Sequence, residues 1–386
     1  MKTSKQAFDV TVYLDCNATT PVEPEVAEIV RFYTEQEFGN AGSRTHEFGT
    51  KAKQAVFESR QKVAALVPGI DSSDVVFTSG ATESNNIAIL GMLSWAKKSG
   101  KKHIITSAIE HKAVLEPIAF AESQGFEVTR ISPSESGAID ASAVSEAIRD
   151  DTFLISVMHV NNETGIIQPI DEIAEALPQA GCYLHVDAAQ GYGKEFEKLA
   201  HSRIDLISIS GHKIYAPKGI GALIIRRQKF KRAPLEPIFF GGGQERGLRP
   251  GTLPVPLICG LGKAAELCQQ NQSSRAKVNR TFRQMLFKAL EGLDYKLNGD
   301  ESLSVPNAVS LSFSGINSEA LMLALKGITA ISNGSACTSQ SYESSYVLKA
   351  MGLPDDRIHS AIRLSWCHMT NEPDWHAFHQ AIASLA

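Results

Sequence analysis

Between about residue 75 and residue 226, short apolar runs rich in β-branched residues alternate with longer amphipathic stretches. This alternation is typical of βαβ units, in which parallel strands are joined by helices that cover the faces of one sheet. Several runs are apolar throughout, as strands buried on both faces are. We therefore expect an α/β fold with a mostly parallel central sheet, whose strands lie at 75–78, 103–107, 126–131, 153–160, 183–187, 205–210 and 222–226.

A change of sequence character after Gly243 predicts a second, smaller domain. Turn residues at 249–251 and 254–256 precede a helical stretch over about 257–293. Strand, helix and strand patterns then follow at 307–313, 319–325 and 361–365. A chain of 386 residues is long enough for two domains of roughly 150 residues or more. We expect a large domain over 17–256 and a small α+β domain formed by 1–16 together with 257–386.

Charge and composition exclude several classes of protein. The chain has 38 Lys and Arg against 42 Asp and Glu, a net charge of −4, so no basic field would draw nucleic acid or an anionic membrane. The N-terminal stretch lacks the apolar core of a signal peptide and no run of 18 apolar residues occurs, which predicts a cytoplasmic protein. The six cysteines form no CxxC pair, so neither a disulfide framework nor a metal site is expected.

Polar residues follow three consecutive predicted strands, at the sheet edge where ligands bind in such folds. Asn162 follows the strand at 153–160, and Asp187 ends the next strand shortly before Gln190. Lys213 follows the strand at 205–210. Taken singly, Asp187 would be a turn-capping residue and Lys213 a solvated surface residue. Together they bring an amide, a carboxylate and an amine to one edge.

A fourth strand end leads through Gly80 into a predicted helix over 82–97. The free N–H groups and the dipole of a helix start can hold a phosphate. The segment is neither a Walker A loop nor a GxGxxG motif. A phosphate cradle, a carboxylate and a lysine on one edge are what pyridoxal 5'-phosphate needs. The lysine forms the Schiff base, and the carboxylate keeps the ring nitrogen protonated.

With these residues the sequence resembles the long-loop class of cysteine desulfurases, pyridoxal-phosphate enzymes of fold type I within aminotransferase class V. The resemblance covers nearly the whole chain. It implies a homodimer that converts L-cysteine to L-alanine and passes the sulfur to an acceptor protein. The matching segments are YLDCNATTP (13–21), SGATESNN (79–86), EHK (110–112), VNNETG (160–165), HVDAAQ (185–190), SISGHK (208–213), RPGT (249–252) and GSACTS (334–339).

The resemblance also implies a role for each matching residue. Catalytic roles fall on Lys213, Cys337 and His111, with Lys213 forming the Schiff base and removing the substrate α-proton. Asn162 and Arg363 bind the substrate, Arg363 through its carboxylate. The residues implied to contact the cofactor are Lys213, Asp187 at the ring nitrogen, Gln190 at the ring hydroxyl, His111 stacked on the ring, Ala81, Asn162, the phosphate ligands Thr82, Ser210 and His212, and Thr252, which reaches the phosphate from the second subunit.

Two of these residues have features that support their roles. Cys337 lies in a stretch of small and polar side chains, 331–342, which predicts a mobile, accessible segment of the kind a reactive thiol needs. The resemblance makes it the residue that receives sulfur as a persulfide. The other five cysteines lack such surroundings and are predicted to be structural. Arg363 lies in an apolar strand, where its charge needs a partner, and we expect the substrate carboxylate to supply it.

Three features depart from the family's usual pattern. Trp366-Cys367-His368 stands where a Gly-Arg pair is common, which leaves the role of His368 open. The chain ends at Ala386, without the longer scaffold-docking tail of the iron–sulfur members, and 39–46 (GNAGSRTH) replaces a Gly-Asn-Pro-Ser-Ser segment. The last two features favour the desulfurases that supply sulfur for DNA phosphorothioate modification, with an enzyme of that pathway as acceptor.

Other functions remain open at this point. The chain could be a sulfur donor for iron–sulfur clusters or for tRNA thiolation. It could also be an aminotransferase or a selenocysteine lyase, because a fold does not fix the reaction. A sulfur carrier without catalysis would be colourless, and the intact Lys213 and Asp187 argue against it.

Overall fold

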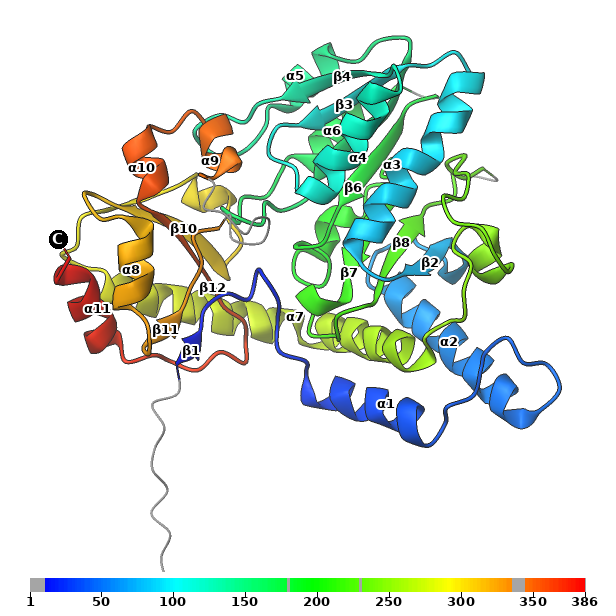
Figure 1. Cartoon of the computed structure of the whole chain (residues 1–386), viewed down its shortest axis with the longest axis horizontal. Helices are drawn as coiled ribbons and strands as arrows, with labels where there is room; N and C mark the ends of the chain where they lie inside the picture. Colours follow the sequence, from blue (N-terminus) through cyan, green and yellow to red (C-terminus); the bar gives the residue numbers. More distant parts are fainter. Residues whose placement is uncertain (1–10, 179–180, 229–230, 335–343, 386) are drawn as a thin grey trace, which may run out of the picture.

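The computed structural model describes residues 11–178, 181–228, 231–334 and 344–385. They form a large body around a seven-stranded sheet, with a smaller body beside it (Figure 1). The strands of the large sheet are β2 (Val75–Thr78), β3 (His103–Ser107), β4 (Glu127–Ile131), β5 (Thr152–Met158), β6 (Tyr183–Asp187), β7 (Leu206–Ser210) and β8 (Gly221–Ile225). Their order is β2-β8-β7-β6-β5-β3-β4, and all neighbours are parallel except the two pairs formed by β8. The predicted α/β fold is confirmed.

Helices cover both faces of this sheet because strand side chains alternate between two hydrophobic clusters. The helices of this body are α1 (Pro24–Glu35), α2 (Glu47–Ala65), α3 (Ala81–Lys98), α4 (Lys112–Ser123), α5 (Ala141–Glu146), α6 (Ile170–Ala176) and the first part of α7 (Val255–Ala289). In β2, Val76 packs with α3 and α4, whereas Val75 and Phe77 face the cluster that contains residues of α2, α5, α6 and α7. The sheet is therefore buried on both sides, as its apolar strands predict.

The smaller body contains an antiparallel sheet whose strands lie in the order β12 (Ala361–Ser365), β10 (Ala308–Phe313) and β9 (Tyr295–Leu297). Its core includes Leu14, Phe313 and Trp366, together with Phe282 and Leu286 from the second part of α7. Helix α7 thus packs into both bodies, and the predicted boundary at 256/257 stays a prediction. The elements are β1 (Val12–Tyr13), β9 (Tyr295–Leu297), β10 (Ala308–Phe313), α8 (Ser318–Ala324), β11 (Thr329–Ala330), α9 (Tyr346–Ala350), α10 (Asp355–His359), β12 (Ala361–Ser365) and α11 (Trp375–Ala383).

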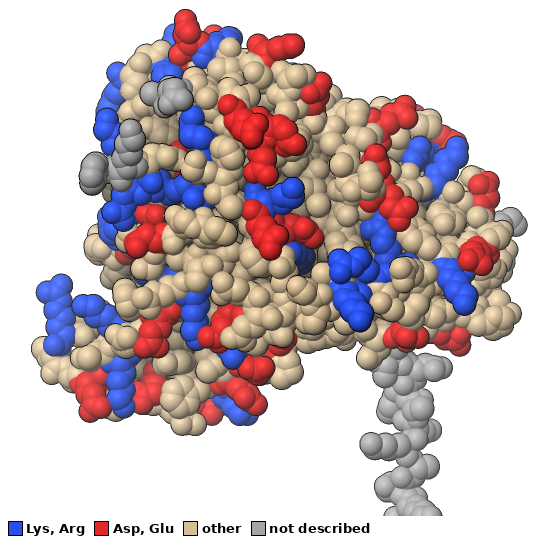
Figure 2. Space-filling model, turned by 180° about the vertical axis from the view of Figure 1, so that it is seen from behind, with Lys and Arg blue, Asp and Glu red and all other residues tan. Residues whose placement is uncertain are grey.

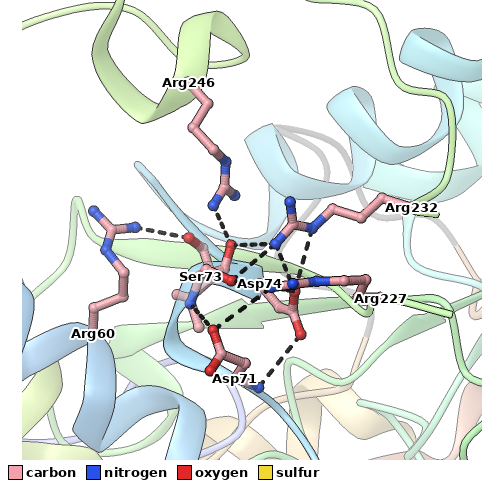
Figure 3. Close-up of polar contacts among 8 residues, drawn as sticks. Arg60, Asp71, Ser73, Asp74, Arg227, Arg232 and Arg246 are labelled. Atoms are coloured by element: carbon pink, nitrogen blue, oxygen red, sulfur yellow. Dashed lines mark hydrogen bonds and ion pairs between the residues drawn. The ribbon is translucent and has the colours of Figure 1, made fainter. Parts of the chain in front are cut away.

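A cluster of arginines fixes the turn that leads into β2 (Figure 3). Arg60 forms an ion pair with Glu245, and Arg246 donates to the carbonyl of Ser73. Glu245 and Arg246 have φ angles of 48° and 60°, a left-handed conformation that residues other than glycine rarely adopt. Their contacts with Arg60 and Ser73 hold this conformation in place. The start of β2 is thereby fixed, and β2 ends at the glycine turn before α3.

Among the described residues, none of the helices combines the length and the apolar character needed to cross a bilayer. On the face shown in Figure 2, basic and acidic side chains are interspersed.

Candidate active site

One cavity of about 460 Å³ lies where the ends of β5, β6 and β7 meet the start of α3. This volume is within the range of roughly 300–1,000 Å³ that is common for ligand pockets. The cavity wall includes ten residues selected from the sequence: Ala81, Thr82, His111, Asn162, Asp187, Gln190, Ser210, His212, Lys213 and Arg363. They come from segments far apart in the chain, and the fold brings them together.

Two selected residues are not part of this wall. Thr252 lines a separate cavity with Phe239, Phe240 and Arg249. Its expected role in the site of a second subunit therefore stays a prediction. Cys337 lies outside the described residues, as does most of the segment 331–342 that was expected to be mobile.

Two donors orient the carboxylate of Asp187 at the end of β6. The Nδ2 atom of Asn85 donates to Oδ2 at 2.8 Å, and the backbone N–H of Ala189 donates to Oδ1 at 3.0 Å. Asp187 is only 4% exposed, so these bonds replace water as its partners. Sequence reasoning missed Asn85. The signal was its place in the matching segment 79–86, on the helix that starts beside the site.

Lys213 is the last residue of the short helical turn η3 (Gly211–Lys213), which directly follows β7. Its Nζ donates to the carbonyl oxygens of Asn17 at 2.5 Å and Ala18 at 2.8 Å. The Asn17 carbonyl also accepts from Nε2 of Gln190 at 2.8 Å. The segment after β1 therefore forms a wall of the cavity, a role that sequence reasoning did not assign to it.

His111 is the N-cap of α4, and its Nδ1 accepts a hydrogen bond from the backbone N–H of Ala113 at 3.1 Å. Burial lowers the pKa of His111, because a desolvated imidazolium is disfavoured, although the nearby Asp187 carboxylate acts in the opposite direction. The ring is therefore neutral, with its proton on Nε2. A neutral aromatic ring in the cavity wall can stack on a planar ligand.

The start of α3 forms the end of the cavity that suits a phosphate. Gly80, with a φ of 155°, makes the turn from β2, and a Cβ there would lie 3.7 Å from Oγ of Ser210. The first N–H groups of any helix lack partners within the helix, so those of Ala81 and Thr82 are available to an anion. Burial, with help from the positive charge of Lys213, lowers the pKa of His212 to about 4.

Arg363 lies in the middle of β12 and is 1% exposed. It pairs with Oδ1 of Asp15 at 2.5 Å and donates to the Asn162 carbonyl at 3.0 Å. The substrate carboxylate was expected as its partner, but the structure already supplies Asp15. The Nε atom of Arg363 and Oδ1 of Asn162 are buried without a hydrogen-bond partner in the described residues. Because buried polar atoms are normally bonded, these two suit a bound polar ligand.

His368 is not in the cavity wall. Its Nε2 lies 3.2 Å from Oε1 of Glu23, and its ring meets that of Tyr215 edge-on at 4.7 Å. Glu23 also forms an ion pair with Arg275 of α7. His368 therefore joins α1 to the segment after β12, which answers the question left open by its sequence. The five other cysteines are buried, as predicted for structural residues.

The carboxylate, the amine, the helix start and the aromatic ring fit pyridoxal phosphate, and the unpartnered Arg363 and Asn162 atoms fit an amino acid beside it. Fold and site together define a pyridoxal-phosphate enzyme that acts on amino acids. Residues 12–378 match the model of the aminotransferase class V family, and the chain belongs to that family.

Similar proteins narrow the activity further. The chain is 47% identical over 366 residues to the cysteine desulfurase IscS of Klebsiella pneumoniae, covering 94% of this chain and 89% of that protein. The crystal structure of DndA from Streptomyces lividans has 48% identity and a TM-score of 0.80, covering 93% of this chain and 100% of that one. A structure described as SspA in complex with cysteine has 37% identity and a TM-score of 0.81, covering 92% and 98%. The chain is a cysteine desulfurase that uses pyridoxal phosphate.

Proposed function

We propose that the cavity residues carry out desulfuration of L-cysteine with Cys337 as the sulfur-receiving group. The observation that supports this proposal is the convergence of Lys213, Asp187, His111 and Arg363 on one cavity. The structure of SspA in complex with cysteine supports the choice of ligand for a related protein.

Each cavity residue has one task in this proposal. When bound, pyridoxal phosphate supplies an electron sink for the amino acid. The Nζ of Lys213 accepts the substrate α-proton, and Asp187 holds the ring nitrogen in its protonated form. Gln190 binds the ring hydroxyl, His111 stacks on the ring, and Ser210 and His212 bind the phosphate together with the start of α3. Arg363 binds the substrate carboxylate, and Asn162 also binds the substrate.

Sulfur transfer is a covalent step on the protein. The Cys337 thiolate attacks the substrate sulfur, an S–S bond forms, and the bond between that sulfur and the substrate β-carbon breaks. The β-carbon gains a proton, alanine leaves, and Cys337 carries a persulfide. No external oxidant is needed, because one thiol and cysteine yield one persulfide and alanine. A second thiol, on an acceptor protein, then takes the terminal sulfur.

We also propose that the protein is a homodimer and that it acts in the cytoplasm. Thr252 shares its separate cavity with Phe239 and Phe240, which are 49% and 88% exposed. Large aromatic side chains exposed together are common at protein interfaces. A second copy of the chain on this surface would bring Thr252 to that copy's phosphate site.

The acceptor that we propose is an enzyme of DNA phosphorothioate modification. The segment 39–46 and the 48% identity with DndA support it. A second candidate, sulfur donation to iron–sulfur clusters or to tRNA thiolation, is supported by the 47% identity with IscS. Incubation of the persulfide form with purified acceptors of each kind distinguishes the two, with transfer of the sulfur measured by mass spectrometry.

Replacing Cys337 tests the central step. The Cys337→Ser variant is expected to bind pyridoxal phosphate normally but to form no alanine from L-cysteine, and mass spectrometry of the parent should find one added sulfur on Cys337. Parental alanine formation by Cys337→Ser would refute the proposal. Turnover of an α-keto acid without persulfide would instead favour an aminotransferase.

A further inference from the structure

Glu163 has a buried carboxyl group that none of the steps above uses. The residue is 4% exposed and directly follows Asn162 in the cavity wall. Oγ of Ser345 donates to Oε2 of Glu163 at 2.5 Å. A Cβ added at Gly334 would lie 3.3 Å from the same oxygen and 3.7 Å from Cβ and Cγ of Glu163. The side chain of Glu163 therefore lies beside both Gly334 and Ser345, which are far from it in sequence.

These two segments flank the stretch of chain that contains Cys337. Ser332 exchanges two backbone hydrogen bonds with Arg363, of 2.6 and 3.3 Å, and its Oγ accepts from the N–H of Gly334 at 3.1 Å. Ser345 caps α9, because its Oγ accepts from the N–H of Leu348 at 3.1 Å. Residues 335–343, which include Cys337, connect these anchored ends and lie outside the described part of the chain.

Glu163 itself is held rigidly beside the substrate site. Oδ1 of Asn161 accepts from the backbone N–H groups of Glu163 at 2.9 Å and Thr164 at 3.0 Å, which fixes the turn after β5. The preceding residue, Asn162, accepts from Arg363 through its carbonyl. The turn that carries Glu163 is thus bonded to the arginine that is proposed to bind the substrate.

We infer that Glu163 is a positioning residue for Cys337. By bonding Ser345 and packing against Gly334, it fixes both ends of the Cys337 segment at the side of the cavity where Arg363 lies. This inference rests on the proposed role of Cys337 as sulfur acceptor. Glu163 itself does not contact the substrate. Loss of its side chain should therefore slow sulfur transfer without weakening the binding of cofactor or L-cysteine.

The protonation state of Glu163 guides the choice of variant. Burial raises the pKa of Glu163, and the bond from Ser345 and the charge of Arg363 act against that rise. Glutamine has the same shape and keeps an oxygen that can accept from Ser345. Glu163→Gln is therefore the conservative variant, and Glu163→Ala removes both the bond and the packing.

The experiment uses the holoenzyme and separates binding from transfer. Absorbance of the bound cofactor, titrated with L-cysteine, reports substrate binding, and single-turnover mass spectrometry reports the rate of persulfide formation on Cys337. For Glu163→Ala we expect unchanged titrations and a transfer rate lower by about 10- to 100-fold, as expected when reacting groups are displaced by ~1 Å. Glu163→Gln should restore most of the rate. Parental transfer by Glu163→Ala, or equal loss in Glu163→Gln, would overturn the inference.

Further variants keep the test decisive. If Glu163→Ala does not fold, Ser345→Ala takes its place, with Ser345→Thr as the variant that retains the hydroxyl and Ser344→Ala as the neighbouring control. Only Ser345→Ala should slow transfer, and a parental rate in it would overturn the inference. Cys337→Ser separates the two levels. If it still forms alanine, the proposed function fails, whereas if it is inactive and Glu163→Ala transfers normally, only the role of Glu163 fails.

Discussion

Asp15 and Arg363 form an ion pair of 2.5 Å that joins the segment after β1 to the middle of β12. Arg363 is 1% exposed, so its charge depends on this partner whenever no substrate is bound. Within the part of the chain that the structure describes, Nε of Arg363 has no hydrogen-bond partner, so the guanidinium is oriented in advance but not saturated. The same contact therefore stabilises the free protein and prepares the substrate site.

Asp15→Asn tests this double role. Asparagine can still accept from Arg363 but removes the compensating charge. We expect the free energy of unfolding of the cofactor-free protein to fall by about 3 kcal/mol, the lower end of the cost of breaking a buried pair. Urea unfolding of parent and variant measures the loss. In the holoenzyme, L-cysteine should raise the free energy of unfolding more for Asp15→Asn than for the parent. An equal increase would contradict the role of the pair in preparing the substrate site.

Asn85→Ala should weaken the retention of pyridoxal phosphate. The variant removes the 2.8 Å bond to Oδ2 of Asp187, which is proposed to bind the ring nitrogen. A hydrogen bond to a charged group contributes about 1.5–3 kcal/mol, so the dissociation constant should rise about 10- to 100-fold. Absorbance titration of the cofactor-free protein measures it. Asn271→Ala is the matched control, because the Asn271 side chain donates to the backbone carbonyl of Leu267 within α7. A change in the control as large as in Asn85→Ala would contradict the prediction.

The buried carboxyl of Glu110 should make the free energy of unfolding depend on pH. Its carboxyl is fully buried, and desolvation raises its pKa to about 8 although Ser107 and the N–H of Met158 donate to it. Because the folded pKa lies above the unfolded value of 4.5, its favourable contribution is complete below pH 4.5 and is lost as the pH rises through 8. Glu110→Gln carries no such charge.

The stability of Glu110→Gln relative to the parent should therefore increase with pH. Between pH 4.5 and 8 the difference in unfolding free energy should change by up to about 1.4 kcal/mol per pH unit in favour of the variant. Urea unfolding at several pH values measures this slope. A constant difference across the range would show that Glu110 does not titrate there.

Much of the fold could be predicted because its strands are apolar on both faces. The predicted ranges 75–78, 103–107 and 183–187 coincide with β2, β3 and β6. The range 153–160 extends two residues beyond Met158, since Val160 is also apolar and buried although it forms only an isolated bridge. Helix α7 was expected from about 257 and starts at Val255, because Pro256 lies in the first turn, where a proline is tolerated.

The site was predictable where chemistry depends on a side chain at a strand end, as for Asp187 and Lys213. Contacts that depend on distant segments were not. Asp15 reaches Arg363 across 348 positions, and the Asn17 carbonyl is recognised only once Lys213 and Gln190 point at it. Every residue has a backbone carbonyl, so the sequence does not show which of them accepts a particular hydrogen bond. The pairing of His368 with Glu23 was equally invisible, because neither residue belongs to a periodic pattern.

Mixed dimers can establish whether Thr252 acts across the subunit boundary. If it does, each site combines Lys213 of one subunit with Thr252 of the other. In a dimer of one Lys213→Ala chain and one Thr252→Ala chain, the intact Lys213 is then served by the intact Thr252, and one site per dimer works fully. A refolded mixture of the two variants should therefore form alanine faster than the two variants do separately, with the rate expressed as alanine formed per subunit. If Thr252 acted within its own chain, every site would carry at least one defect. The mixture would then show no gain over the separate variants, and the proposed place of Thr252 would be wrong.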